Sequence, residues 1–211
     1  MNEDFFVEQL KSLGGLWIHG GGAAPHALLT SGRHSNGYVN MTKVIENPMA
    51  AGDFCRALIN ALTLKGKPDV VAGSAMGAIT IAYQVAAVYG GRTRAVYTEK
   101  VGSEMVLKRF DIAAGEKVLV VEDTMTTGGT TVKTIQALKA AGCDVLPVCG
   151  VLVNRSGKSE LDIPGEAEKY KIVEVIKLDI ESWDADKCPL CSAGSKALRP
   201  KENWKILNSE L

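Results

Sequence analysis

The chain has 211 residues, of which 23% are charged, and its 24 basic and 24 acidic side chains give a net charge of zero. This balance argues against a nucleic-acid-binding face and against a polybasic membrane-binding surface. Residues 1–4 are acidic where a secretory signal would be basic, and no apolar run approaches the roughly 20 residues that span a bilayer. We therefore expect a cytoplasmic protein whose five cysteines are reduced, with neither nucleic acid nor membrane as a partner.

Strand-like and helical patterns alternate along the chain, which predicts an α/β fold with a mainly parallel central sheet flanked by helices. The expected helices cover residues 3–13, 49–64, 78–89 and 130–141, and the expected strands cover residues 70–72, 94–97, 118–121, 145–153 and 172–178. Residues 1–45 are expected to form a small N-terminal hood, residues 46–180 the α/β core and residues 181–211 a C-terminal tail, all within a single structural domain.

A turn rich in hydrogen-bond donors lies in the expected hood. Ser31, Arg33 and His34 precede the aromatic Tyr38. Together they offer donors and a stacking face, which suit a planar anion. The alternative interpretation is a plain turn, with Tyr38 in the core.

Two further loops follow expected strands in the core. Ser74 to Gly77 are small or flexible residues between a strand and a helix, so their backbone NH groups can face an anion, although a tight βα turn has the same pattern. Residues 98–109 are polar and contain glycine. They predict either a mobile lid that carries Lys100, Lys108 or Arg109 to a leaving anion, or a solvated β-hairpin.

Residues 118–130 place a strand pattern, two acids and a hydroxyl-rich turn in succession. The β-branched run before Glu122 and Asp123 is typical of a strand buried on both faces, whose end should place the two acids at the rim of the sheet. The turn Thr126 to Thr130 opens a helix, where backbone NH groups and hydroxyls favour phosphate. Paired carboxylates suit sugar hydroxyls or magnesium. The segment predicts a site for ribose beside phosphate, and the alternative is a turn with solvated acids.

Two features near the end of the core complete the pattern. Arg155 follows an expected buried strand and should emerge at the carboxyl edge of the sheet, where α/β proteins bind ligands. Cys188 and Cys191 form a Cys-x-x-Cys sequence, which supplies only two of the four ligands of a zinc site, and neither Cys143 nor Cys149 shows a paired spacing. We interpret it as a tight turn with free thiols. A redox pair, or a metal site shared across a dimer, stays open.

Residues 118–130 closely resemble the PRPP-binding motif of type I phosphoribosyltransferases. Residues 28–48, the pair Asn154-Arg155 and the sequence Cys-Pro-Leu-Cys extend this resemblance to a bacterial branch of the orotate phosphoribosyltransferases. The resemblance implies a type I phosphoribosyltransferase fold. It also implies transfer of the 5-phosphoribosyl group from PRPP to orotate, which gives orotidine 5-monophosphate and pyrophosphate in pyrimidine synthesis.

The resemblance assigns a role to each candidate residue. It implies catalysis by Glu122, Asp123, Lys100, Lys108 and Arg109. It implies PRPP binding by Ser74, Ala75, Met76, Gly77, Thr124, Thr126, Thr127, Gly128, Gly129 and Thr130. It implies orotate binding by Arg155, Thr126, Ser31, Arg33 and Tyr38.

The same resemblance implies Mg²⁺ as cofactor, with Asp123 as an indirect ligand through Mg-PRPP, and a homodimer in which each lid reaches the neighbouring site. Two alternatives stay open. Thr30 stands where many members have a lysine, so the base could be uracil, xanthine or adenine. The lid lacks the Arg-Lys and Lys-x-His-Gly strings of many members, so the chain could also be a PRPP-sensing regulator without turnover.

Overall fold

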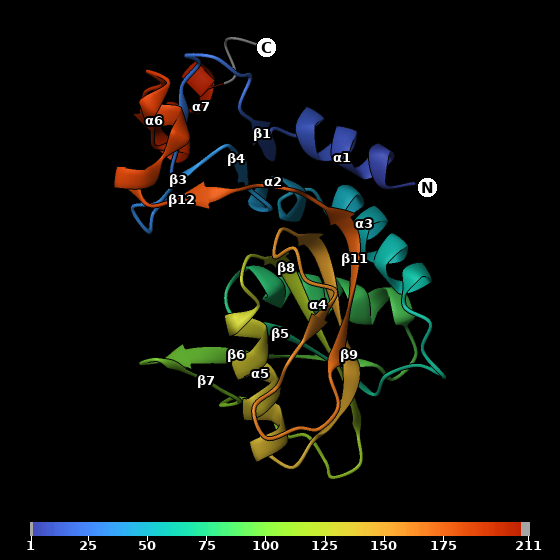
Figure 1. Ribbon diagram of the computed structural model, residues 1–211. Helices are drawn as coiled ribbons and strands as arrows, with labels where there is room; N and C mark the ends of the chain where they lie inside the picture. The colour runs from blue at the N-terminus through green and yellow to red at the C-terminus, as the bar shows by residue number, and fades with distance from the viewer. Residues whose placement is uncertain (1, 208–211) are drawn as a thin grey trace. The chain divides into compact units, whose positions relative to one another are not determined.

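The computed structural model describes residues 2–207, which divide into two compact units (Figure 1). Unit 1 comprises the chain up to Phe6 together with Val44–Leu178, and unit 2 comprises Val7–Lys43 together with the chain from Asp179 onward. The expected hood and the expected tail thus belong to one unit, and the expected core is most of the other. Among the described residues, no helix is long and apolar enough to cross a bilayer.

Unit 1 is built on a seven-stranded sheet with the order β10-β11-β9-β8-β5-β6-β7. The strands are β5 (Val70–Ser74), β6 (Arg94–Val101), β7 (Glu104–Val106), β8 (Lys117–Met125), β9 (Asp144–Asn154), β10 (Glu160–Leu161) and β11 (Tyr170–Lys177). All neighbours are parallel except the two edge strands β10 and β7, which pair antiparallel. The predicted mainly parallel α/β sheet is therefore confirmed.

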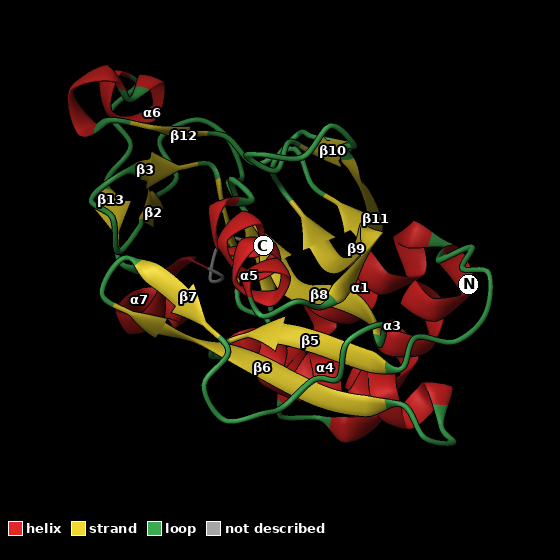
Figure 2. Ribbon diagram, turned by 90° about the horizontal axis from the view of Figure 1, so that it is seen from below, coloured by secondary structure: helices red, strands yellow, loops and turns green. Residues whose placement is uncertain are grey.

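Helices cover both faces of this sheet (Figure 2). They are α3 (Pro48–Ala61), α4 (Gly77–Tyr89) and α5 (Gly129–Ala140), whereas α1 (Glu3–Ser12) and α2 (Thr42–Ile45) each have residues in both units. Val118 and Val120 pack in one apolar cluster with Ile135 and Leu138 of α5. On the opposite face, α3 approaches so closely that a Cβ on Gly150 would lie 2.9 Å from Leu58 Cδ2. Successive residues of each strand therefore pack alternately against the helices on the two faces, which is why the strand sequences are continuously apolar.

Local sequence signals explain where two of these elements begin and bend. Asn47 caps α3, because its side chain accepts hydrogen bonds from the NH groups of Met49 and Ala50 at 3.2 Å, and Pro48 occupies the first turn. In β9, Pro147 lies where the register with β8 shifts, since proline cannot donate to the ladder. The four long predicted helices are present, although α3 ends at Ala61, three residues earlier than expected.

Unit 2 holds short strands around a small apolar cluster. A four-stranded sheet has the order β12-β3-β2-β13, and β1 pairs with β4. These elements are β1 (Leu16–Ile18), β2 (His26–Leu28), β3 (His34–Ser35), β4 (Gly37–Val39), β12 (Ser182–Trp183), α6 (Pro189–Ser192), β13 (Ala197–Leu198) and α7 (Pro200–Leu207). Trp17, Ala27 and Leu207 form the cluster, and the indole NH of Trp17 donates to the Leu207 carbonyl at 2.8 Å.

Candidate active site

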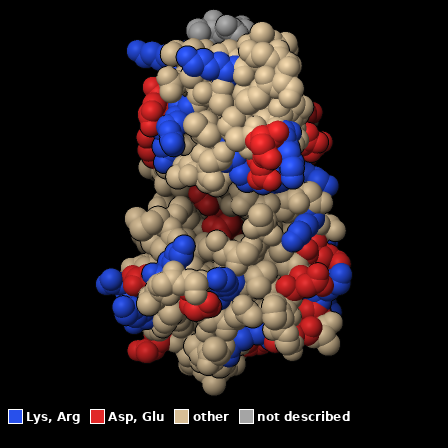
Figure 3. Space-filling view, turned by 60° about the vertical axis from the view of Figure 1, so that its left-hand side comes forward, with Lys and Arg blue, Asp and Glu red and all other residues tan. Residues whose placement is uncertain are grey.

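A pocket of about 220 Å³ opens in unit 1 where β5 and β8 lead into helices α4 and α5. Its walls are the two predicted loops and its acids come from β8. The lining residues are Ser74, Ala75, Met76, Gly77, Glu122, Asp123, Thr124, Met125, Thr126, Thr127, Gly128, Gly129, Thr130 and Thr131. Every residue assigned above to PRPP binding is in this set. Figure 3 shows acidic side chains set back in a hollow on one face of the molecule, while lysines and arginines lie on the surrounding surface.

The hydroxyl-rich turn Thr126 to Thr130 forms one side of the pocket and leads into α5. Gly128 precedes the helix with a φ of 83°, a left-handed conformation that favours glycine. A Cβ at this position would also lie 2.6 Å from Leu161 Cδ2, so the loop passes close to β10. The first NH groups of α5 are free of helical partners and face the pocket end of the helix, which favours an anion there.

The loop Ser74 to Gly77 forms the opposite side and leads into α4. The Ala75–Met76 peptide is cis, and the Met76 side chain is 82% exposed. Gly77 lies directly against the acid pair, since a Cβ there would be 2.2 Å from Asp123 Oδ2. Only glycine therefore permits both the start of α4 and the Asp123 carboxylate at their observed positions.

The acid pair lies inside β8 rather than beyond its end. The strand continues to Met125, and Glu122 is 7% exposed, so the expectation that both acids mark the rim is wrong for Glu122. Its carboxylate accepts a hydrogen bond from Ser74 Oγ at 2.6 Å. Burial raises the pKa of Glu122 to about 8 and also raises the pKa of Asp123. The pocket floor therefore holds carboxyl groups that a nearby positive charge would ionise.

The segment expected to be either a lid or a hairpin is a β-hairpin in the structure. It consists of β6 and β7, and the turn between them is held by Lys133 of α5, which donates to the Ser103 carbonyl. The Arg109 guanidinium is paired with the Glu99 carboxylate, which raises the pKa of Arg109. Lys100 and Lys108 are exposed. Of the three predicted lid cations, Arg109 is the one that already has an acidic partner.

Arg155 follows β9 at the carboxyl edge of the sheet, as predicted. Its NH donates to the Met125 carbonyl at 2.9 Å, which places it beside the end of β8. The buried Asn154 builds the next turn: its Oδ1 accepts from the NH and Oγ of Ser156, and its Nδ2 donates to the Lys158 carbonyl at 2.9 Å. Burial of the Arg155 guanidinium lowers its pKa.

Lys158 is a cation near the phosphate turn that the sequence analysis missed. Its Nζ donates to the Thr127 carbonyl at 3.3 Å. Gly157, two residues after Arg155, is the signal in the sequence for a turn here, and in the structure it turns the chain back with a φ of 70°. A lysine directly after such a turn returns toward the same edge of the sheet.

The three residues assigned to orotate binding in the hood belong to unit 2 and have partners there. The Arg33 guanidinium is paired with Asp184 at 2.5 Å and donates to the Ser182 carbonyl at 2.6 Å. Tyr38 packs on the apolar cluster of unit 2, with its ring 6.1 Å from that of Trp204. Ser31 is exposed and its Oγ accepts from the Arg33 NH at 3.5 Å. Their role toward orotate stays a prediction.

A family model that describes a phosphoribosyl transferase domain matches residues 42–183. The orotate phosphoribosyltransferase of Mycobacterium tuberculosis in complex with Fe(III) dicitrate superimposes with a TM-score of 0.64 at 25% identity, over 83% of this chain and 96% of that one. The enzyme from Aeropyrum pernix superimposes with a TM-score of 0.64 at 23% identity, over 82% and 93%. The chain belongs to the phosphoribosyltransferase family and has the type I phosphoribosyltransferase fold.

Curated relatives define its place within that family. An orotate phosphoribosyltransferase of Desulforamulus reducens is 40% identical over 83% of this chain and 87% of the relative. Another, from Acidithiobacillus ferrooxidans, is 36% identical over 95% of this chain and 97% of the relative. Within the family, the chain belongs with the orotate phosphoribosyltransferases.

Proposed function

We propose that this chain transfers the 5-phosphoribosyl group of PRPP to orotate, giving orotidine 5-monophosphate and pyrophosphate in pyrimidine synthesis. One observation carries the proposal: two carboxyl groups, buried Glu122 and part-buried Asp123, line a pocket between two loops that each lead into a helix. Two anionic groups joined by a ribose have this arrangement, and PRPP is such a molecule. A solved relative, the M. tuberculosis enzyme, is described in complex with PRPP.

Each of the two loops binds a different anionic group of PRPP. The turn Thr126 to Thr130 at the start of α5 binds the 5-phosphate, because its hydroxyls and free NH groups are donors. The loop Ser74 to Gly77 binds the pyrophosphate. Glu122 and Asp123 then face the ribose that lies between the two anions.

The acid pair stabilises the charge that develops on the ribose. A buried carboxyl group with a raised pKa ionises most readily when a positive charge forms beside it, and preorganised carboxylates in a dry site stabilise an oxocarbenium-like transition state. The described residues that line the pocket include no cysteine and no histidine that could activate a hydroxyl, and the proposal assigns the two carboxyl groups to the developing charge. We therefore expect direct displacement of pyrophosphate without a covalent enzyme intermediate.

The carboxylate and hydroxyl oxygens of the pocket fit Mg²⁺, which prefers oxygen ligands and keeps several waters when it is bound with phosphates. Asp123 is only part-buried, so it can reach Mg²⁺ held on PRPP through water. When bound, the ion neutralises the departing pyrophosphate. Arg155, at the neighbouring strand end, is placed to bind the orotate carboxylate through its two-pronged guanidinium.

Lys100 and Lys108 are the lid cations that fit the leaving pyrophosphate, because both are exposed while Arg109 is paired with Glu99. The protein acts in the cytoplasm, as a homodimer in which the β6–β7 hairpin of one subunit serves the site of the other. This arrangement would bring the two lysines to the pyrophosphate, in a pocket whose described lining residues include no lysine.

The deciding experiment follows the loss of orotate absorbance when the purified protein is mixed with PRPP and Mg²⁺. We expect loss that requires Mg²⁺ and that falls at least about 100-fold in Asp123→Asn, whose side chain keeps its shape but cannot ionise. Uracil, xanthine and adenine are tested in parallel. Turnover of one of these in place of orotate, or PRPP binding by calorimetry with no turnover of any base, would refute the assignment.

A further inference from the structure

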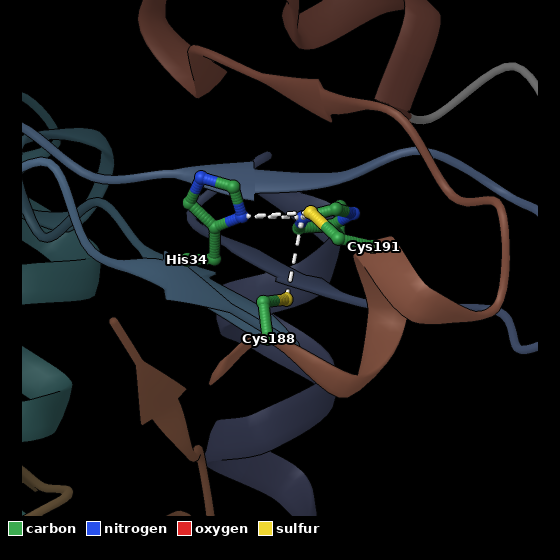
Figure 4. Close-up of side chains that lie close together, drawn as sticks. His34, Cys188 and Cys191 are labelled. Atoms are coloured by element: carbon green, nitrogen blue, oxygen red, sulfur yellow. Dashed lines mark hydrogen bonds between the residues drawn. The ribbon is translucent and has the colours of Figure 1, made fainter. Parts of the chain in front are cut away.

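Four side chains of unit 2 converge on one point. His26 lies on β2, His34 on β3, and Cys188 and Cys191 flank the first turn of α6. One ligand atom from each lies within 4.8 Å of every other. Figure 4 shows His34, Cys188 and Cys191 directed toward a common centre. His26, His34 and Cys188 are buried, whereas Cys191 lies at the surface.

Four of the six distances between these atoms lie within about 0.4 Å of the edges of a tetrahedron around zinc, and the other two are below 4.8 Å. Zn–S bonds of about 2.3 Å and Zn–N bonds of about 2.05 Å give edges of about 3.6 Å between N and S and about 3.3 Å between two nitrogens. Cys188 Sγ and Cys191 Sγ lie 3.6 Å and 3.5 Å from His26 Nε2, and Cys191 Sγ lies 3.2 Å from His34 Nδ1. The two nitrogens are 2.9 Å apart. A metal requires only small shifts of the side chains.

The hydrogen bonds around His26 leave its Nε2 as a bare lone pair at this centre. Ser195 Oγ donates to the Ala24 carbonyl, so it accepts from His26 Nδ1–H, 2.7 Å away. His26 Nε2 then carries no proton, and three groups approach its single lone pair: His34 Nδ1, Cys188 Sγ and Cys191 Sγ. One lone pair cannot accept three hydrogen bonds, but one cation satisfies all four atoms together. Ser195 is the outer partner that such a histidine usually has.

We infer that His26, His34, Cys188 and Cys191 form a closed structural Zn²⁺ site within a single chain. Two thiolates and two imidazoles with no position left for water are the donor set of structural zinc. The common centre of the four atoms excludes a two-iron cluster, which would divide the ligands between two metal ions. The site joins the β2–β3 hairpin to α6, and His26 and Cys188 are 162 residues apart along the chain.

The test begins with the metal content of the full chain, purified without chelators and measured by mass spectrometry of the elements. We expect about one zinc per chain. Replacement of zinc by Co²⁺ should give the thiolate charge-transfer and d–d absorption bands of tetrahedral cobalt. Cys191→Ser, at the surface and therefore tolerated by the fold, should lose the zinc and the cobalt bands.

Two more variants sharpen the assignment. Cys143→Ser removes the same kind of atom from unit 1 and should keep a full equivalent of zinc, because Cys143 lies in the apolar core of unit 1 and is not one of the four ligands. Ser195→Ala touches no ligand atom directly and should weaken zinc binding by about 10- to 100-fold. Chelator should lower the melting temperature of the wild-type chain but not that of Cys191→Ser.

Several results would overturn the inference. Wild-type protein with less than about 0.1 zinc per chain and no cobalt bands would do so, as would a bound iron cluster. A Cys188–Cys191 disulfide in metal-free protein would identify a redox pair instead. Full zinc retention in Cys191→Ser would show that the metal lies elsewhere.

Discussion

Gly77→Ala should damage the pocket while it leaves the fold of unit 1 largely intact. The added Cβ would lie 2.2 Å from Asp123 Oδ2 and 2.7 Å from Asp123 Cγ. Ordinary contact needs about 3.4 Å or more, so the carboxylate must retreat by about 1 Å. A displacement of about 1 Å in a catalytic group costs on the order of 100-fold in rate. We therefore expect kcat/KM for PRPP to fall about 100-fold, which corresponds to about 2.7 kcal/mol.

Gly73→Ala is the matched control, because it makes the same change four residues earlier. Its Cβ would lie 2.2 Å from the Ala78 carbonyl oxygen, and backbone cannot rotate away. Overpacking of this kind costs about 1–3 kcal/mol or more in stability. Asp123 is part-buried and can swing toward the pocket, so Gly77→Ala should cost less than about 1 kcal/mol.

The assay combines steady-state kinetics of orotate consumption with urea unfolding of both variants. We expect a kinetic defect with near-native stability for Gly77→Ala and a loss of stability for Gly73→Ala. Activity of Gly77→Ala within threefold of wild type, in a protein of wild-type stability, would show that the position of the Asp123 carboxylate does not matter. An equal loss of stability in both variants would refute the contrast between a side chain and backbone as the obstructing group.

Three other changes test separate parts of the site. Arg155→Ala should raise the KM for orotate about 10- to 100-fold and the KM for PRPP less than twofold, because it removes a charge-assisted hydrogen bond to the base alone. Steady-state kinetics with each substrate varied measures both constants. Equal increases in the two KM values would contradict this role. Burial raises the pKa of Glu122 from 4.5 to about 8. Between these pH values its carboxyl group is ionised in the unfolded chain but protonated in the folded one. The free energy of unfolding in chelator should therefore fall from pH 5 to pH 8, by on the order of 3 kcal/mol, and Glu122→Gln should lose most of this fall; parallel slopes would contradict it. Gly128→Ala should destabilise the protein by about 1–2 kcal/mol in urea unfolding and weaken PRPP binding in calorimetry. The φ of Gly128 is 83°, and Leu161 leaves no room for an added Cβ. Unchanged stability and affinity would show that the turn adapts.

The sheet and the pocket loops were predictable because their signals are local. The β-branched run Val118 to Val121 is typical of a strand buried on both faces, and the strand 70–72 has the same character. Parallel strands that lead into helices bring their following loops to one edge of the sheet, so Ser74 and Thr126 had to meet. The lining of the pocket confirms this juxtaposition.

Other features depend on contacts that no local pattern contains. β8 continues through Glu122, although an acidic residue after an apolar run usually indicates the end of a strand. The Glu122 carboxyl group accepts a hydrogen bond from Ser74 Oγ, and its backbone pairs with the parallel strand β9. The strands of unit 2 are two or three residues long and have no measurable periodicity. The Cys-x-x-Cys spacing indicates other cysteines as further ligands, but the neighbours of Cys188 and Cys191 in space are His26 and His34, far away in the sequence. Only the β2–β3 pairing brings those two imidazoles together.

Unit 2 takes its residues from both ends of the described chain, which sets an order of events during synthesis. Residues 44–178 of unit 1 emerge without interruption and can fold as they appear. The hairpin of β2 and β3 is made earlier but must wait for β12 and β13, its outer neighbours in the four-stranded sheet. At 5–20 residues per second, that wait is roughly 8 to 30 seconds. Throughout it, the outer edges of the hairpin lack these two neighbours, so this early segment can pair with other chains until β12 and β13 emerge.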